Sequence, residues 1–362
     1  MTKARELAKL GEVMTNSQIG GRRNIIINGA MQVAQRGTSA TGKTTGGFFT
    51  VDRSKFDLVN LGTYTYSQST DSPDGFSNSL RVDCTTTASL SADSLLYALC
   101  TGIEGQDLQH LKKGTSNAES VTVSFYVKSN KTGTYVLEVY DGMNTRHIAK
   151  TYTISSANTW EYKTLTFVGD TTGTLSNTNA FGMGLFFWIS GGSNYTSGTL
   201  PSSWASVTNA NRASGLTVNL ADSTDNDWAI TGVQMEVGNY PNGTPFEHRS
   251  FGDELLLCQR YYYQSHTTLT SGVGMGNPWI GDAINTTEIW GSHRFAPMMR
   301  TTPIVNIYDN AGNAGATHHL GSADKSSISV DIRSNRGFIK LSGSGLTSGG
   351  IHASQYSADA EL

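Results

Sequence analysis

Five aromatic residues lie in stretches of sequence that suit a binding surface. Trp188, Tyr195 and Trp204 occupy a Gly-, Ser- and Asn-rich stretch, and Tyr64 and Tyr66 alternate with threonine in an earlier segment. Sugar rings present apolar faces that stack on aromatic rings, while their hydroxyl groups reach Asn, Asp and Ser side chains. The sequence therefore predicts glycan binding by these residues. For Trp188, burial in the core is an equally weighted interpretation.

A second group of residues could bind a metal ion. Asp222, Asp225 and Asp227 place three carboxylates within six residues. Ca²⁺ takes several oxygen ligands from loops of this kind, although the spacing differs from that of an EF-hand. This turn is a candidate site for a structural Ca²⁺ ion, and a solvated acidic turn is the favoured alternative. No other cofactor is expected.

Motifs for catalysis are weak. Residues 37–44 (GTSATGKT) match the phosphate-loop pattern, but Gly-Gly-Phe-Phe follows where a helix should begin, which favours a flexible linker. Glycoside hydrolysis needs two carboxylates about 5–10 Å apart. The spacing of residues in the sequence does not determine this distance when the residues lie on different strands. We therefore expect a protein that is not an enzyme. The carboxylates available for such a pair are Glu138, Asp141, Asp170, Asp222, Asp225, Asp227 and Glu236.

The N-terminal region carries an excess of positive charge. Residues 1–43 contain seven Lys and Arg against two Glu, giving +5, while the rest of the chain is −8. Apolar residues recur at helical spacing within residues 2–14, which predicts a short amphipathic helix that docks on another chain. An extended arm follows, with a short strand at Ile25–Ile27. The residues expected to anchor this arm are Leu7, Leu10, Met14, Arg22, Arg23, Ile25, Ile26 and Ile27.

The elements that must position these residues are mainly β-strands. Only 15% of the 362 residues are charged and 40 are glycine, which favours short strands joined by polar turns. We predict an all-β fold with four parts: a helix and basic arm (1–47), a jelly-roll sandwich (48–247), a linker helix (248–264) and a smaller C-terminal β-sandwich (265–362). A capping box at residues 250–253 supports the linker helix.

The sequence also indicates whether the chain enters a membrane and in what state its cysteines are. No run approaches the roughly 20 apolar residues of a membrane-spanning helix, and the N-terminus lacks the apolar region of a secretory signal. We therefore expect no membrane insertion. The three cysteines, Cys84, Cys100 and Cys258, show no metal or disulfide spacing and are expected to be buried thiols.

Three stretches resemble a known group of proteins. Residues 24–37 (NIIINGAMQVAQRG), 228–263 (beginning WAITGVQMEVG and ending TPFEHRSFGDELLLCQRYYY) and 295–303 (FAPMMRTTP) are similar to segments of tail-fibre and other virion proteins of tailed phages, notably marine and cyanobacterial ones. The middle region also resembles jelly-roll carbohydrate-binding modules.

The resemblance implies a protein of the phage virion that forms a homotrimer. It implies that residues 1–47 attach to other virion proteins, and that the β domains bind polysaccharide on the host cell surface. No nucleic-acid partner is expected. Two alternatives stay open: a purely structural head-decoration, head-fibre or tail-connector protein, and a glycan depolymerase.

Overall fold

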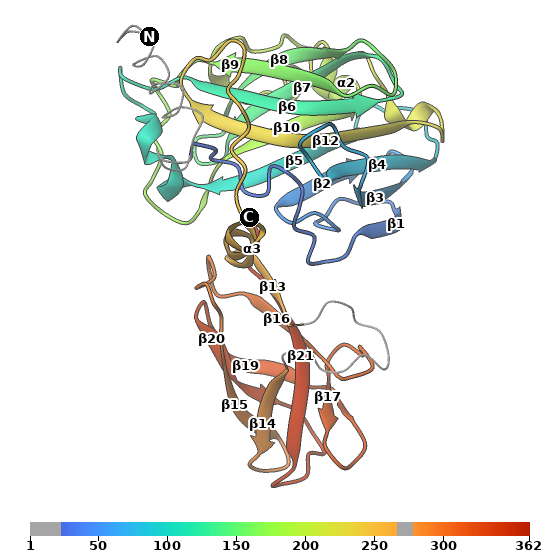
Figure 1. Cartoon of the computed structure of the whole chain (residues 1–362), viewed down its shortest axis with the longest axis vertical. Coiled ribbons are helices and arrows are strands. Elements are labelled where there is room, and N and C mark those ends of the chain that lie inside the picture. The colour runs from blue at the N-terminus through green and yellow to red at the C-terminus, as the bar shows by residue number, and fades with distance from the viewer. Residues whose placement is uncertain (1–22, 266–277) are drawn as a thin grey trace, which may run out of the picture. The chain divides into compact units, whose positions relative to one another are not determined.

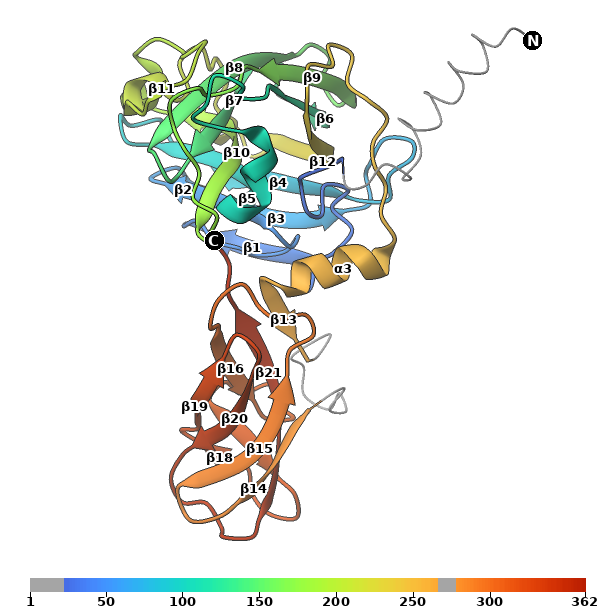
Figure 2. The same cartoon turned by 90° about the vertical axis from the view of Figure 1, so that its left-hand side faces the viewer.

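The structure is a computed structural model that describes residues 23–265 and 278–362 (Figures 1 and 2). The chain divides into two compact units, the first ending at Ser250 and the second beginning at Phe251. Antiparallel strands dominate both units, which confirms the expected all-β class. The helix expected within residues 2–14 lies outside the described residues, and so do the anchoring candidates Leu7, Leu10, Met14 and Arg22.

The first unit is a sandwich of two six-stranded antiparallel sheets, as expected for a jelly roll (Figure 1). The first sheet has the order β1 (Ser39–Lys43), β3 (Thr63–Ser69), β4 (Ser79–Thr86), β12 (Asp227–Val237), β6 (Val121–Ser129), β9 (Glu161–Phe167). The second sheet has the order β11 (Ala205–Ser206), β8 (Arg146–Ile154), β7 (Gly133–Asp141), β10 (Phe181–Gly191), β5 (Leu95–Glu104), β2 (Ser54–Val59). Short helices connect some of the strands: η2 (Gly105–Leu111), α2 (Ser193–Thr196), η3 (Asn209–Asn211) and η4 (Leu220–Asp222).

The core of this unit lies between the two sheets. Val123, Phe125 and Val127 of β6 are fully buried, because alternate residues of a strand face the same side. The ring of Phe125 packs edge-on against Phe187 of the second sheet, with the ring centroids 5.0 Å apart. The alternate positions of β6, which include Ser124 and Tyr126, face away from this core.

Residues 23–33 are an integral part of the first unit, which corrects the expectation of a separate arm. Ile26 and Met31 are buried in the core. The backbone N–H of Ile25 donates to the carbonyl of Met235 at 2.9 Å. Residues 25–27 form no regular strand in the described structure, contrary to expectation.

Polar contacts tie the same segment to the end of the unit. The backbone N–H of Asn24 donates to Glu247 Oε2 at 2.6 Å, and its side-chain amide donates to the carbonyl of Val233 at 3.2 Å. Arg23 donates to the carbonyl of Pro245 at 2.7 Å. Arg23, Ile25 and Ile26 therefore take part in the packing of this unit. The buried Ile26 is corrected from an anchoring residue to a core residue, while anchoring by Arg23, Ile25 and Ile27 stays a prediction.

Residues 37–44, expected as a flexible linker, contain the edge strand β1. It pairs with β3, with Ala40 opposite Tyr66 and Lys43 opposite Tyr64. The Lys43 ammonium lies 4.8 Å from the centre of the Phe49 ring. The next element after β1 is the strand β2, so the loop lacks the helix N-terminus that binds phosphate.

The second unit begins with α3 (Phe251–Gln259), which confirms the expected helix in this region. Its strands form one antiparallel network that encloses a core containing Trp279, Phe338 and Tyr356. The long strand β21 pairs with β14 and β17 over its first half, and with β13 and β16 over its second half. The strands are β13 (Tyr262–Gln264), β14 (Trp279–Ala283), β15 (Glu288–Arg294), β16 (Ile304–Tyr308), β17 (Ala316–His319), β18 (Lys325–Ser326), β19 (Ser329–Ser334), β20 (Gly337–Ser342) and β21 (Ile351–Asp359).

The cysteines are as expected. Cys84, Cys100 and Cys258 are buried, and none of them forms a disulfide bond in the described part of the chain. Burial raises the pKa of the Cys100 thiol to about 12, so this group stays protonated at neutral pH. Among the described helices, none has the length and apolar character needed to span a membrane.

Candidate functional site

Trp188 belongs to a buried aromatic cluster rather than to a binding loop. Its side chain is fully buried, because Tyr195, Leu200 and Ala213 of the following loop pack over the outer face of the second sheet. The indole N–H donates to Glu138 Oε2 at 2.9 Å. Trp188 therefore cannot stack on a ligand, and the alternative of burial is the correct one.

Tyr195 and Trp204 are half-buried, and their side chains contact other residues of the first unit. The ring of Tyr195 lies 5.4 Å from that of Trp188. The indole N–H of Trp204 donates to the carbonyl of Val168 at 2.7 Å, and the Lys113 ammonium lies 4.5 Å from the centre of its ring. The structure does not combine these residues into one open surface.

Tyr64 and Tyr66 are fully buried in the core between the sheets. Tyr66 stacks on Phe56 of the second sheet, with ring centroids 4.1 Å apart. Their alternation with threonine is the period of a strand with one buried face, and here the tyrosines occupy the buried face. Both are corrected from binding residues to core residues.

The acidic turn does not gather its carboxylates around one point. Asp222 pairs with Lys131, and Asp227 Oδ2 lies 2.8 Å from an Arg81 nitrogen. Within the described residues, no group of three or more His, Cys, Asp or Glu side chains is arranged to hold a metal ion. Two of the three proposed ligands, Asp222 and Asp227, are thus paired with cations, and the described structure does not support the ligand set Asp222, Asp225 and Asp227.

The buried acids considered for hydrolysis are ion-paired or hydrogen-bonded. Asp141 and Asp170 both pair with Lys113, and Arg146 adds a second partner for Asp170 at 2.8 Å. Burial acts to raise the pKa of Asp170, but hydrogen bonds from Arg146 and Lys113 hold that pKa below its ordinary value. A general acid needs a raised pKa, so this arrangement is suited to stability rather than to proton donation.

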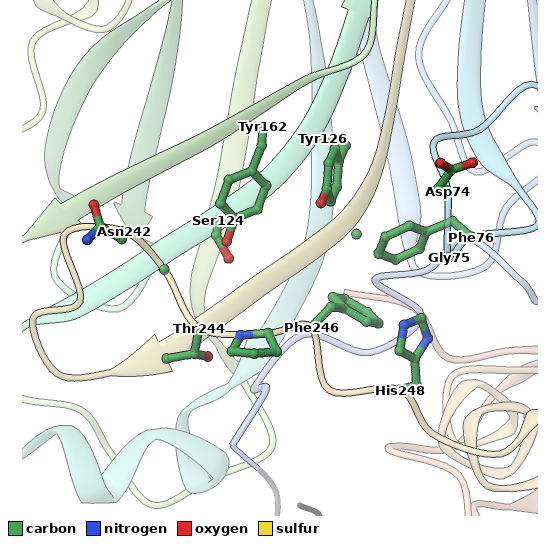
Figure 3. Close-up of a pocket in the computed structure, with 13 residues that line it drawn as sticks. Asp74, Gly75, Phe76, Ser124, Tyr126, Tyr162, Asn242, Thr244, Phe246 and His248 are labelled. Atoms are coloured by element: carbon green, nitrogen blue, oxygen red, sulfur yellow. The ribbon is translucent and has the colours of Figure 1, made fainter. Parts of the chain in front are cut away.

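A groove lies on the outer face of the first sheet, in a place that sequence reasoning did not identify (Figure 3). Its volume is about 450 Å³, which falls in the range of small-molecule sites. The strands β6, β9 and β12 and two loop segments line it. The lining residues are Asp74, Gly75, Phe76, Ser124, Tyr126, Tyr162, Gly232, Asn242, Gly243, Thr244, Pro245, Phe246 and His248.

Aromatic rings form a continuous row along this groove (Figure 3). The ring centroids of Tyr162 and Tyr126 lie 4.9 Å apart, and Tyr126 lies 5.5 Å from Phe76. Phe76 in turn contacts Phe246 at 5.0 Å and His248 at 5.2 Å. Tyr162 is 41% exposed, so the row is accessible at its β9 end.

Strand register places the two tyrosines together. Tyr126 of β6 lies directly opposite Tyr162 of β9. Tyr126 faces outward because its neighbours Phe125 and Val127 face the core. Gly232 of β12 has a φ of +62° and lies at an interruption of the register, where a Cβ atom would come within 2.7 Å of Phe76. Glycine is therefore required for Phe76 to approach the sheet.

Polar groups surround the aromatic row. Among the described residues, no hydrogen-bond partner is found for the side chains of Asp74, Ser124 or Asn242, nor for the hydroxyl of Tyr162. Thr244 is held in place, because its hydroxyl lies 2.8 Å from Glu236 Oε2. The groove thus combines apolar ring faces with available donors and acceptors, which is the combination that sugar recognition needs.

The sequence contains a signal for one residue of this groove, but not for the way in which the groove is assembled. Tyr126 stands between two apolar residues of an alternating strand, which predicts an outward position. The register that brings Tyr162 beside it, and the fold of residues 239–248 over β6, depend on contacts between distant parts of the chain.

Comparisons with solved structures found distant matches, which include carbohydrate-binding modules and a phage tailspike domain. No protein-family model matches the chain, and no curated protein is similar to it in sequence. The enzymatically active domain of tailspike protein 4 from bacteriophage CBA120 matches with 12% identity and a TM-score of 0.30, over 59% of this chain and 21% of that one. The chain therefore corresponds to about a fifth of that tailspike structure.

Two further matches span whole chains of the solved structures. A family 11 carbohydrate-binding module from Clostridium thermocellum has 10% identity and a TM-score of 0.26, over 61% of this chain and all of that one. A structure described as that of a sugar-binding protein from Bacteroides thetaiotaomicron has 12% identity and a TM-score of 0.29. The match covers 59% of this chain and 100% of that one. At these scores the similarity assigns neither function nor residues, and the function is inferred from the groove itself.

Proposed function

We propose that the first unit binds a carbohydrate chain in the groove on the outer face of its first sheet. The observation that carries this proposal is the row of rings from Tyr162 through Tyr126 to Phe76, bordered by polar side chains without partners. An extended row suits a chain of sugar units better than a single compact ligand, because successive rings can each cover one apolar sugar face.

We place this activity in a virion appendage of a tailed phage, as the sequence resemblance implies. The ligand would be polysaccharide on the host cell surface, and a homotrimer would turn weak binding at each site into firm adhesion. We assign attachment to other virion proteins to Leu7, Leu10, Met14, Arg22, Arg23, Ile25 and Ile27. Binding without catalysis is proposed, with a decoration or connector protein and a depolymerase as the alternatives.

The test is binding of the full chain to a glycan array, followed by calorimetry with the glycans retained. Replacing Tyr126 and Tyr162 together by alanine is expected to weaken binding about thirtyfold, because each stacked ring contributes about 1 kcal/mol. The matched control is Phe251→Ala, since Phe251 is 57% exposed and lies outside the groove. Circular dichroism checks that each variant is folded.

Two results would overturn carbohydrate binding in the groove, and a third would overturn binding without catalysis. One is the absence of glycan binding by folded protein on an array that contains host polysaccharide, which would favour a decoration or connector protein. The other is equal binding by the double variant and the wild type. Release of reducing ends from bound polysaccharide would show a depolymerase and contradict binding without catalysis.

A further inference from the structure

Three arginines line one cavity in the second unit. Arg294 ends β15, Arg333 lies near the end of β19, and Arg336 is in the turn before β20. They line a cavity of about 220 Å³ together with His293. The apolar part of the lining comes from Ile332, Phe338 and Ile339.

The backbone holds these arginines close to one another. The three strands are neighbours in the order β15, β20, β19 (Figure 2), with Arg294 opposite Gly337 and Arg333 opposite Phe338. The N–H of Phe295 donates to the carbonyl of Arg336 at 3.0 Å, which fixes the turn against β15. A Cβ atom at Gly337 would lie 1.9 Å from the carbonyl oxygen of His293, so this close approach requires glycine.

The inner wall of the cavity is also fixed. His293 is half-buried, and its Nε2 lies 2.5 Å from the Tyr356 hydroxyl oxygen. Arg333 donates to the carbonyl of Val330 at 3.2 Å. The cavity is thus built by paired strands and by side chains anchored to them, and its charged groups are exposed at the rim.

In the part of the chain that the structure describes, this concentration of positive charge has no acidic counterpart. Within the described residues, no ion pair is found for Arg294, Arg333 or Arg336. The carboxylates of the same strands, Glu288 and Asp331, both bind Lys340, at 2.7 and 2.8 Å. Residues 251–362 contain nine Asp and Glu against seven Lys and Arg, so the cluster does not reflect a generally basic unit. Neighbouring like charges without a counter-charge repel one another, and an anion would relieve that repulsion.

We infer that this cavity binds an acidic saccharide, through a carboxylate, sulfate or phosphate group on a sugar ring. Guanidinium groups present paired N–H donors that match the oxygens of such anions. The aliphatic side chains of Ile332 and Ile339 provide an apolar surface for the face of the ring. This site is in a different unit from the groove of the first sheet and does not depend on carbohydrate binding there.

The test is calorimetry on the full chain with probes that differ in charge. We use trigalacturonate as the carboxylate probe, a sulfated maltotriose as the sulfate probe, and maltotriose as the uncharged probe. We expect the two acidic probes to bind, to weaken as salt is raised, and to lose at least about tenfold in affinity in the Arg333→Gln/Arg336→Gln variant. The control Lys325→Gln removes one cation of the same unit outside the cavity and is expected to change affinity less than twofold.

Four results would overturn the inference. They are the absence of binding by both acidic probes, equal binding of maltotriose, an equal loss in the Lys325→Gln control, and tighter binding of a single-stranded DNA 12-mer than of any saccharide. The Tyr126→Ala/Tyr162→Ala variant separates the two sites. It is expected to keep full affinity for the acidic probes, whatever the groove of the first sheet binds.

Discussion

Arg212 is the residue around which the buried aromatic cluster of the first unit is organised. Its guanidinium lies 5.1 Å from the centre of the Trp188 ring and bonds to both oxygens of Glu138 at 3.1 Å. His147 Nδ1 lies 2.8 Å from the same carboxylate. Burial acts to raise the pKa of Glu138, but the hydrogen bond from His147 and the charge of Arg212 lower it below its ordinary value.

Removing this cation should be costly. In Arg212→Gln we expect the free energy of unfolding to fall by about 3 kcal/mol, because a buried carboxylate loses its charged partner. Denaturant unfolding at pH 7 measures the change. The control is Lys112→Gln, which breaks an exposed pair with Glu119 and should cost less than about 1 kcal/mol. Equal losses in the two variants would contradict the structural role of Arg212.

At the scale of elements, residues 23–33 pack into the first unit and connect its beginning to its end. Asn24 connects to Glu247 and Val233, and Asn28 donates to the carbonyls of Val33 and Asp52 at 2.8 and 2.9 Å. The contacts of Asn24 join residues 24–37 to residues 228–263. These two stretches therefore have an architectural role in the first unit, independent of any ligand.

Truncation tests this element. Deleting residues 1–43 should destabilise the first unit by several kcal/mol or prevent its folding, because it removes the buried side chains of Ile26 and Met31. Deleting residues 1–22 leaves every described contact in place and should preserve the melting temperature. Thermal melts of the two truncated proteins make the comparison. A normal melting temperature after the longer deletion would show that residues 23–33 are dispensable for the fold.

At the scale of the whole molecule, each unit has its own hydrophobic core, and the second contains an acid-sensitive pair. His319 and His352 lie opposite each other on β17 and β21 and stack with ring centroids 4.5 Å apart. Burial lowers the pKa of His352 to about 4, and the charge of His319 adds to this effect. Both ring nitrogens of His352 are buried without a partner among the described residues.

Acid should therefore weaken the second unit. An unfolded histidine takes up its proton near pH 6.5, so stability is fully present above that pH and decreases as pH falls toward 4. We expect the melting temperature of this unit in differential scanning calorimetry to fall by about 5 °C or more over that range. His352→Leu should remove most of the decrease.

The control is His318→Gln, which changes a half-buried histidine paired with Asp324 in the same unit. It should keep the acid sensitivity. Unchanged pH dependence in His352→Leu would show that other groups cause the decrease.

Local patterns in the sequence determined much of this protein. The all-β class, a sandwich in the first part of the chain and the helix near residue 251 follow from strand periodicity, turn residues and a capping box, which act over a few neighbouring residues. Which face of a strand is buried also follows an alternation, but a tyrosine by itself does not say whether its half of the alternation faces the core. Tyr64 and Tyr66 turned inward, while Tyr126 turned outward.

Only the tertiary structure decided where the candidate sites lie. The groove needs the register of β6 with β9 and the return of residues 239–248 over the sheet. The arginine cavity needs three strands whose order differs from their order in the chain. Likewise, the pairing of the acidic turn with Lys131 and Arg81 joins residues about 90 to 150 positions apart. Such contacts depend on chain topology, and no short stretch of sequence contains them.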